Sequence, residues 1–224
     1  MDAVIKIGGS MAEIPDALKA LCLELSNIAK KHQVVVIPGG GKFADAVREL
    51  DAKFRLPPLF SHRMAILSMD QYGLFLSQII PNSCICDSFQ EIEQISERGK
   101  VALFLPSRVL FEEDPFKPSW DVTSDSISAY FAIKLQATKI ILITDVDGIF
   151  DKNPKQNSNA QLLCKVSADE LLSHTERSSI DRFLPNLLLE NQLDCFVVNG
   201  LYPARISEIL KGQKTTCTQI VKQN

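Results

Sequence analysis

The chain has 224 residues, of which 46% are hydrophobic and 23% are charged. This composition is typical of a soluble globular protein, and the length suits one compact domain over residues 1–224. Its 24 basic and 27 acidic side chains give a net charge of −3, which argues against binding nucleic acid or an anionic membrane surface. No apolar run reaches the roughly 20 residues of a membrane span. The six scattered cysteines are expected to be reduced thiols of a cytoplasmic protein.

Short apolar runs alternate with longer helical patterns along the N-terminal half. Buried positions in the helices are spaced by three and four residues, whereas the strands are apolar without alternation. The predicted elements are, in order, a strand at 3–7, a helix beginning near Pro15, a strand ending at Ile37, helices at 43–53 and 61–80, a strand at 101–105 and a loop at 112–120.

The C-terminal half continues the same alternation. Its predicted elements are a helix at 123–135, a strand ending at Thr144, a polar loop at 151–161, a helix capped by Ser167 and Glu170, a strand ending at Val198, a helix at 203–211 and a strand at 215–221. This order predicts an α/β protein with a mainly parallel central sheet. Ligands of such sheets bind at the carboxyl ends of the strands.

Two glycine-rich corners each follow a predicted strand and precede a predicted helix. The first contains Gly8, Gly9 and Ser10, and the second contains Gly39, Gly40 and Gly41. Glycines let a backbone approach phosphate closely, and a helix start adds free N–H donors. Lys6 is positioned to reach an anion at the first corner, and Arg48 follows the second. The alternatives are a tight turn with a surface lysine and a solvated helix face.

Two further polar segments fall at strand ends or helix starts. WDVTSDSISA places Thr123, Ser124 and Asp125 at a helix start, where they are either capping residues or ligands around a transferring phosphate. TDVDGIFDKNPK follows a predicted buried strand, and its carboxylates suit a ribose or an adenine amine unless the segment is a simple Asp-Gly turn.

Other catalytic arrangements are absent from the sequence. His32, His62 and His174 have no metal-ligand spacing, and there is no G-x-S-x-G nucleophile motif. We therefore expect no protein metal site and no acyl hydrolase.

In this order, IKIGGS, PGGG, TSD and TDVDGIFDKNP resemble the amino acid kinase family, which includes acetylglutamate, uridylate, aspartate and isopentenyl phosphate kinases. The resemblance continues to VVNGLYPARISEILKG and covers nearly the whole chain. It implies a three-layer α/β/α sandwich that binds an acceptor in its N-terminal half and ATP with Mg²⁺ in its C-terminal half. We also expect a homo-oligomer.

The matching positions imply a role for each motif. Lys6 is expected to bridge the transferring phosphate, and Asp125 to hold catalytic lysines in place. The implied nucleotide-binding residues are Gly8, Gly9, Ser10, Thr144, Asp145, Val146, Asp147, Gly148, Phe150, Lys152 and Pro154. The implied acceptor-binding residues are Gly39, Gly40, Gly41, Arg48, Thr123 and Ser124. The second catalytic cation is left open between Lys152 and Arg182.

Within the family, PGGGKFADAVR, HRMAILSMDQYG and SWDVTSDSIS are similar to the branch that phosphorylates [5-(aminomethyl)furan-3-yl]methyl phosphate in methanofuran biosynthesis. An acidic group from Asp45, Asp70 or Asp121 is expected to face the ammonium of that small phosphorylated acceptor. The alternatives are a uridylate or isopentenyl phosphate kinase-like enzyme, a kinase of a carboxylate acceptor, and an ATP-binding sensor without catalysis.

Overall fold

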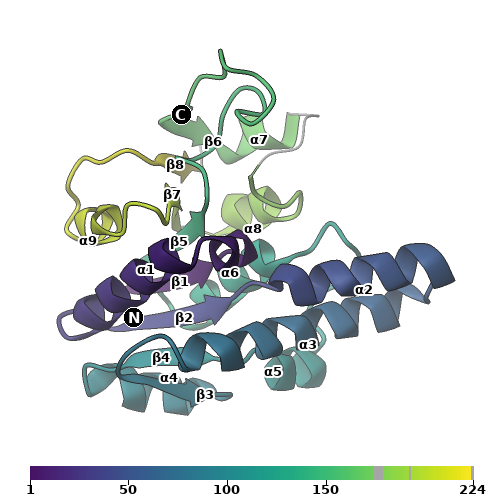
Figure 1. The fold of residues 1–224 in the computed structure, drawn as a ribbon, viewed down its shortest axis with the longest axis horizontal. Helices are drawn as coiled ribbons and strands as arrows, with labels where there is room; N and C mark the ends of the chain where they lie inside the picture. The colour runs from purple at the N-terminus through teal and green to yellow at the C-terminus, as the bar shows by residue number, and fades with distance from the viewer. Residues whose placement is uncertain (174–178, 192, 223–224) are drawn as a thin grey trace.

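The computed structural model describes residues 1–173, 179–191 and 193–222, so His174 lies outside the described residues. Its strands form one eight-stranded sheet in the order β3-β4-β2-β1-β5-β7-β8-β6 (Figure 1). The strands are β1 Ala3–Ile7, β2 Val34–Pro38, β3 Ser83–Cys86, β4 Val101–Phe104, β5 Lys139–Thr144, β6 Lys165–Ser167, β7 Asp194–Asn199 and β8 Thr218–Val221. Within the described residues, β7–β8 is the one antiparallel pair. The prediction of a mainly parallel central sheet is confirmed.

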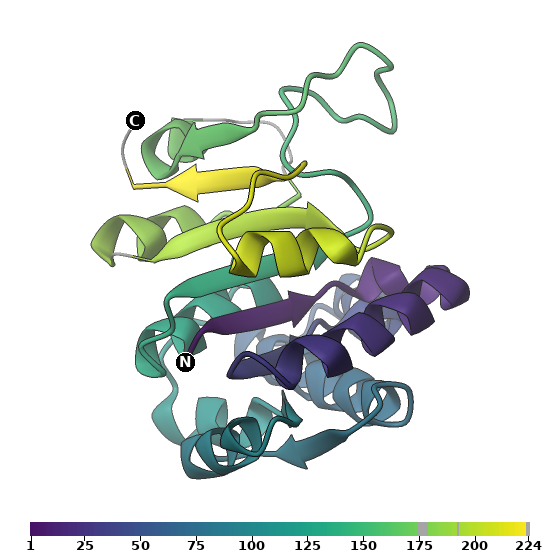
Figure 2. The same cartoon turned by 90° about the vertical axis from the view of Figure 1, so that its left-hand side faces the viewer.

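Helices cover both faces of this sheet. They are α1 Pro15–Ala29, α2 Gly41–Phe54, α3 Pro58–Ser77, α4 Phe89–Glu97, α5 Ser107–Glu113, α6 Ser124–Lys134, α7 Ala168–Ser173, α8 Leu184–Glu190 and α9 Ala204–Leu210. Successive strand residues point to opposite faces, so Val4 packs with the apolar side chains of α4, α6 and α8. Ile5 packs with those of α1 and α9, which lie on the same side of the sheet in Figure 2. The expected three-layer α/β/α sandwich is therefore confirmed.

Most predicted elements appear within a few residues of their predicted bounds, but several were missed. The missed elements are β3, α4, α5, α8 and β6. The capping box of α4 was readable, because Ser88 caps the helix and Glu91 accepts from the Asp87 N–H at 3.1 Å. The predicted loop at 112–120 is wrong at its start, since α5 continues to Glu113.

The order of the central strands places the predicted motifs together. β1 lies between β2 and β5 and is parallel to both, so the segments that follow these three strands share one edge of the sheet. The helices α2 and α3 pack against each other and extend beyond the sheet (Figure 1). Among the described residues, no helix is both long enough and apolar enough to cross a membrane.

Candidate active site

Lys6 forms a buried ion pair with Asp125. Its amine lies 2.7 Å from the Asp125 carboxylate, and the two side chains are 12% and 8% exposed. Lys6 stands opposite Ile37 of β2 and Leu142 of β5, so it rises from the middle of the sheet toward α6. The alternative of a surface lysine is excluded, because a buried amine of this kind needs an anionic partner.

The two glycine corners are in contact with each other. A side chain on Gly9 would place its Cβ 2.1 Å from the Cα of Gly41, and one on Gly8 would reach within 2.6 Å of the Ile143 carbonyl. Gly41 has a φ of +52°, in the left-handed region that favours glycine. The close approach of the corners is thus one reason for their glycines, and the Gly8 N–H donates to the Ile143 carbonyl at 2.9 Å.

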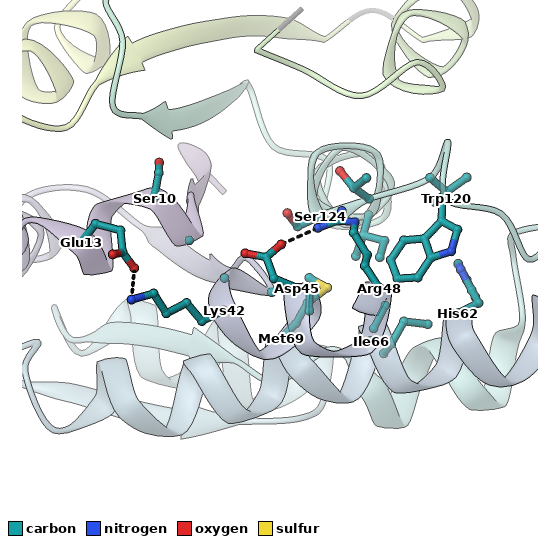
Figure 3. A pocket seen from close by; sticks show the side chains of 18 residues that line it. Ser10, Glu13, Lys42, Asp45, Arg48, His62, Ile66, Met69, Trp120 and Ser124 are labelled. Atoms are coloured by element: carbon teal, nitrogen blue, oxygen red, sulfur yellow. Dashed lines mark hydrogen bonds and ion pairs between the residues drawn. The ribbon is translucent and has the colours of Figure 1, made fainter. Parts of the chain in front are cut away.

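A pocket of about 450 Å³ opens beside these corners (Figure 3). Five of the residues predicted to bind the acceptor line it, namely Gly40, Gly41, Arg48, Thr123 and Ser124. Gly39 is not among the lining residues, and its N–H donates to the Ile7 carbonyl at 2.9 Å. Gly9 and Ser10, predicted to bind nucleotide, also line the pocket, so the two predicted sets of residues meet at the first corner.

One wall of the pocket is built by Arg48 and Trp120. The Arg48 guanidinium lies 4.8 Å from the centre of the indole ring and pairs with Asp45 at 2.9 Å (Figure 3). The indole N–H donates to the Asp51 carboxylate at 2.7 Å. Arg48 therefore is not a freely solvated helix residue, since two contacts orient its charge over an aromatic wall.

The three carboxylates expected to face an ammonium occupy different places. Asp45 lines the pocket, where Arg48 already pairs with it. Asp70 accepts hydrogen bonds from the N–H and the hydroxyl of Ser107, and Asp121 is exposed. Of these three, the structure places only Asp45 in the pocket.

The start of α6 depends on Asp181, a residue that the sequence analysis missed. Thr123 is the N-cap, and Asp181 accepts from its N–H at 2.8 Å and from its hydroxyl at 2.9 Å. Asp181 also accepts from the Ser126 N–H at 3.0 Å, while its own N–H donates to Asp125 at 3.1 Å. Burial, and next the charge of Asp125, raise the pKa of Asp181. No local pattern connects Asp181 with this helix, because more than fifty residues separate them.

The segment after β5 holds the first of two carboxylates that are paired with cations. Asp145 pairs with Lys155 at 2.5 Å, whereas Lys152 is exposed. Burial alone would raise the pKa of Asp145, but the hydrogen bond and charge of Lys155 outweigh it and leave the pKa below its ordinary value. The cation nearest this carboxylate is thus Lys155 rather than Lys152. Arg182, the other predicted candidate, is exposed and forms no ion pair with a described residue.

The second carboxylate of this segment, Asp147, joins β7 and α9. It accepts hydrogen bonds from Arg205 at 2.5 Å and from the Asn199 amide at 3.1 Å. The backbone of the segment is also held, because the Thr218 hydroxyl accepts from the Ile149 N–H at 2.8 Å and would lie 2.4 Å from a Cβ on Gly148.

The other predicted nucleotide-binding residues lie along the same segment. Thr144 ends β5 and accepts from the Gly200 N–H at 2.8 Å. Val146 is partly exposed in the bend that follows, and Phe150 pairs with Leu162 in an isolated antiparallel bridge. Pro154 lies farther along, in the predicted polar loop.

The acidic residues of the site suit magnesium only together with phosphate oxygens. Among the residues that the structure describes, no group of three or more His, Cys, Asp or Glu side chains is arranged to hold a metal ion. Mg²⁺ in phosphoryl-transfer sites is usually held by one or two carboxylates together with substrate phosphates. Asp145 and Asp147 supply carboxylates of that kind, so the donor set fits Mg²⁺ that is bound mainly by a nucleotide.

Comparison with known proteins gives one consistent family. The sequence model of the amino acid kinase family matches residues 1–199. The [5-(aminomethyl)furan-3-yl]methyl phosphate kinase of Methanocaldococcus jannaschii is 37% identical over 220 residues, which cover 97% of each chain. A uridylate kinase of Thermococcus kodakarensis is 25% identical and covers 95% of this chain and 96% of its own. The crystal structure of uridylate kinase from Archaeoglobus fulgidus has a TM-score of 0.78 at 22% identity, over 99% of this chain and 100% of that one. The chain therefore belongs to the amino acid kinase family.

Proposed function

We propose that the protein is an ATP-dependent kinase that converts [5-(aminomethyl)furan-3-yl]methyl phosphate to its diphosphate, a step of methanofuran biosynthesis. The observation that carries this proposal is the 37% identity to the kinase of that compound over 97% of both chains. The geometry agrees with a phosphorylated acceptor, since the pocket beside the glycine corners contains the Arg48 guanidinium and the N-terminal end of α6.

The chemical difficulty of this reaction is repulsion between two anions. The attacking oxygen belongs to a phosphate that is already ionised, so no strong general base is needed. Lys6 precedes the first glycine corner in β1 and stands opposite Ile37, which precedes the second corner in β2. Its amine neutralises charge on the transferring group, while Asp125 holds the amine in place. Backbone N–H groups of the corners and Arg48 position the acceptor. Mg²⁺, when bound, neutralises charge on the donor phosphates.

The two halves of the single domain are proposed to divide the substrates between them. The pocket lined by α2, α3 and the start of α6 takes the acceptor. The segment from Thr144 to Phe150 takes the nucleotide, with Lys155 as the additional cation on that side. The first corner, of which Gly9 and Ser10 line the pocket, faces both substrates.

A panel of acceptors tests the proposal. The purified protein is incubated with MgATP and one of four acceptors, namely the aminomethylfuran phosphate, uridine monophosphate, isopentenyl phosphate or acetylglutamate. We expect the first to have the highest kcat/KM and to give a diphosphate that hydroxylamine does not trap. A higher kcat/KM for uridine monophosphate would instead support the second candidate, which the uridylate kinases among the relatives favour. Absence of turnover with all four would support a sensor.

We further propose a cytoplasmic homo-oligomer. The six cysteines are free, as expected for a reducing compartment. Phe60, Leu67 and Leu74 recur every seventh residue along α3 and are 59%, 44% and 51% exposed. An exposed apolar row of this kind suits contact with the same helix of a second copy. Light scattering gives the molar mass of the assembly formed by the wild type and by Leu67→Glu. The variant should form a smaller assembly, because a carboxylate would be placed in the contact between copies.

A further inference from the structure

A second cavity, of about 200 Å³, adjoins the acceptor pocket. The two cavities share His62, Ala65, Trp120 and Val122 as lining residues, so the indole ring forms a wall of both. Asp51 lines only the second cavity. An acceptor whose phosphate lies at the glycine corners would extend along Trp120 toward this second cavity.

The two cavities differ in charge. Lys42 and Arg48 line the acceptor pocket, each paired at 2.9 Å with a carboxylate that also lines it, Glu13 and Asp45, and a phosphate that replaces these exposed partners would gain both cations. None of the described residues that line the second cavity is a lysine or an arginine, and its one carboxylate is that of Asp51. Ser61 and Ser119 add hydroxyl groups there. A small cavity with a carboxylate, hydroxyl groups and no cation suits an ammonium group.

The titrating groups of the second cavity also favour a cationic ligand. The hydrogen bond from the Trp120 indole N–H lowers the pKa of Asp51, so this carboxylate stays charged near neutral pH. Burial lowers the pKa of His62, so its ring is neutral there and does not repel a cation. A carboxylate accepts several hydrogen bonds, and the bond from the indole N–H therefore leaves Asp51 with accepting capacity.

We infer that Asp51 binds the ammonium of the acceptor's aminomethyl group in this second cavity and so selects the acceptor, an inference that rests on the proposed function. Asp45 is less suited to this role, because Arg48 already pairs with it at 2.9 Å. Trp120 then has two functions. Its ring is a wall for the furan, and its N–H orients the Asp51 carboxylate.

Two acceptors and two variants test this inference. The acceptors are the aminomethylfuran phosphate and (5-methylfuran-3-yl)methyl phosphate, in which a methyl group replaces the aminomethyl group. Asp51→Asn removes the charge but can still accept from the indole N–H. Glu49→Gln, an exposed position on the same helix, is the matched control. The kcat/KM values for both acceptors are measured at saturating MgATP, with thermal unfolding of each variant.

We expect Asp51→Asn to lower kcat/KM for the aminomethyl acceptor by about tenfold to a hundredfold and to leave the methyl acceptor within about twofold. Glu49→Gln should change neither value. Equal losses for both acceptors would show that Asp51 only supports the wall, and would overturn the inference while leaving the proposed function intact. A wild-type enzyme with no preference between the acceptors would overturn it as well. No turnover of either furan phosphate by the wild type would overturn both proposals.

Discussion

The proposed acceptor side and the proposed nucleotide side of this site are built differently. On the acceptor side, Arg48 lies over the Trp120 ring and lines a pocket, and its ion pair with Asp45 is well exposed, at 48% and 64% of the two side chains. On the nucleotide side, Asp145 and Asp147 are already paired with Lys155 and Arg205. An exposed pair is weak, so a phosphate can replace Asp45 at a guanidinium that the indole ring already orients, whereas on the nucleotide side the paired carboxylates are less exposed, at 22% for Asp145 and 38% for Asp147. Preorganised charges contribute more to binding than charges that must first leave a partner.

The largest effect is expected at Lys6, where the two sides meet. Lys6→Met should lower kcat at least about a hundredfold, about 3 kcal/mol, because it removes charge stabilisation of the transferring group. It should also lower the free energy of unfolding by about 3–5 kcal/mol, since Asp125 is left buried without its partner. Steady-state kinetics and denaturant unfolding measure the two quantities.

The double variant Lys6→Met/Asp125→Asn separates catalysis from stability. It removes both charges of the buried pair, so most of the lost stability should return while kcat stays low. Recovery of kcat together with stability would show that Lys6 has only a structural role.

The next effect is expected at Arg48 and tests the preorganised side. Arg48→Ala should raise KM for the acceptor about tenfold to a hundredfold, because a charge-assisted contact to phosphate is lost. The KM for ATP should not change. Lys53→Ala, which removes an exposed cation from the same helix, is the control and should leave both constants unaltered. A rise in KM for ATP would contradict the division of the site.

A smaller effect is expected at Lys155, on the nucleotide side. Its side chain is 65% exposed, and exposed ion pairs contribute little. Lys155→Ala should therefore raise KM for ATP only about two- to fivefold. Lys152→Ala is the matched comparison, because that lysine is exposed and does not pair with Asp145. A larger rise in KM for ATP at Lys152 than at Lys155 would show that Lys152, the residue predicted from the sequence, is the one that contacts the nucleotide.

The smallest effect is the change of stability with pH that we expect from Asp181, which lies at the start of α6. Its pKa is raised in the folded protein, so the folded state binds the proton more tightly than the unfolded state. The free energy of unfolding should therefore fall as pH rises from the ordinary pKa of an aspartate to the raised value. The free energy of unfolding of Asp181→Asn should not show this dependence on pH. It should differ from the wild-type value by an amount that changes across the same pH range. Denaturant unfolding of both proteins at several pH values across this acidic range measures the two slopes. Equal slopes would show that Asp181 does not cause the pH dependence of stability.

Local sequence patterns predicted the parts of the molecule that depend on neighbours in the chain. The strand β1 and the corner after it were readable because apolar runs and glycines act over a few residues. The helix start at Thr123 was readable for the same reason, and the structure makes Thr123 the N-cap. The missed elements are short, and α8, with seven residues, is too short for helical spacing to distinguish from a loop.

Sequence by itself therefore determined the alternation of strands and helices, the two glycine corners and the lysine of β1. Parallel strands end at one edge of a sheet, so these local signals also predicted that the corners would meet. Only the tertiary structure decided which distant groups complete the site, namely Asp181 under α6, Lys155 beside Asp145 and Asp51 behind Trp120. The physical reason is that such contacts depend on how loops and helices pack across the sheet. The spacing of residues along the chain does not predict that packing.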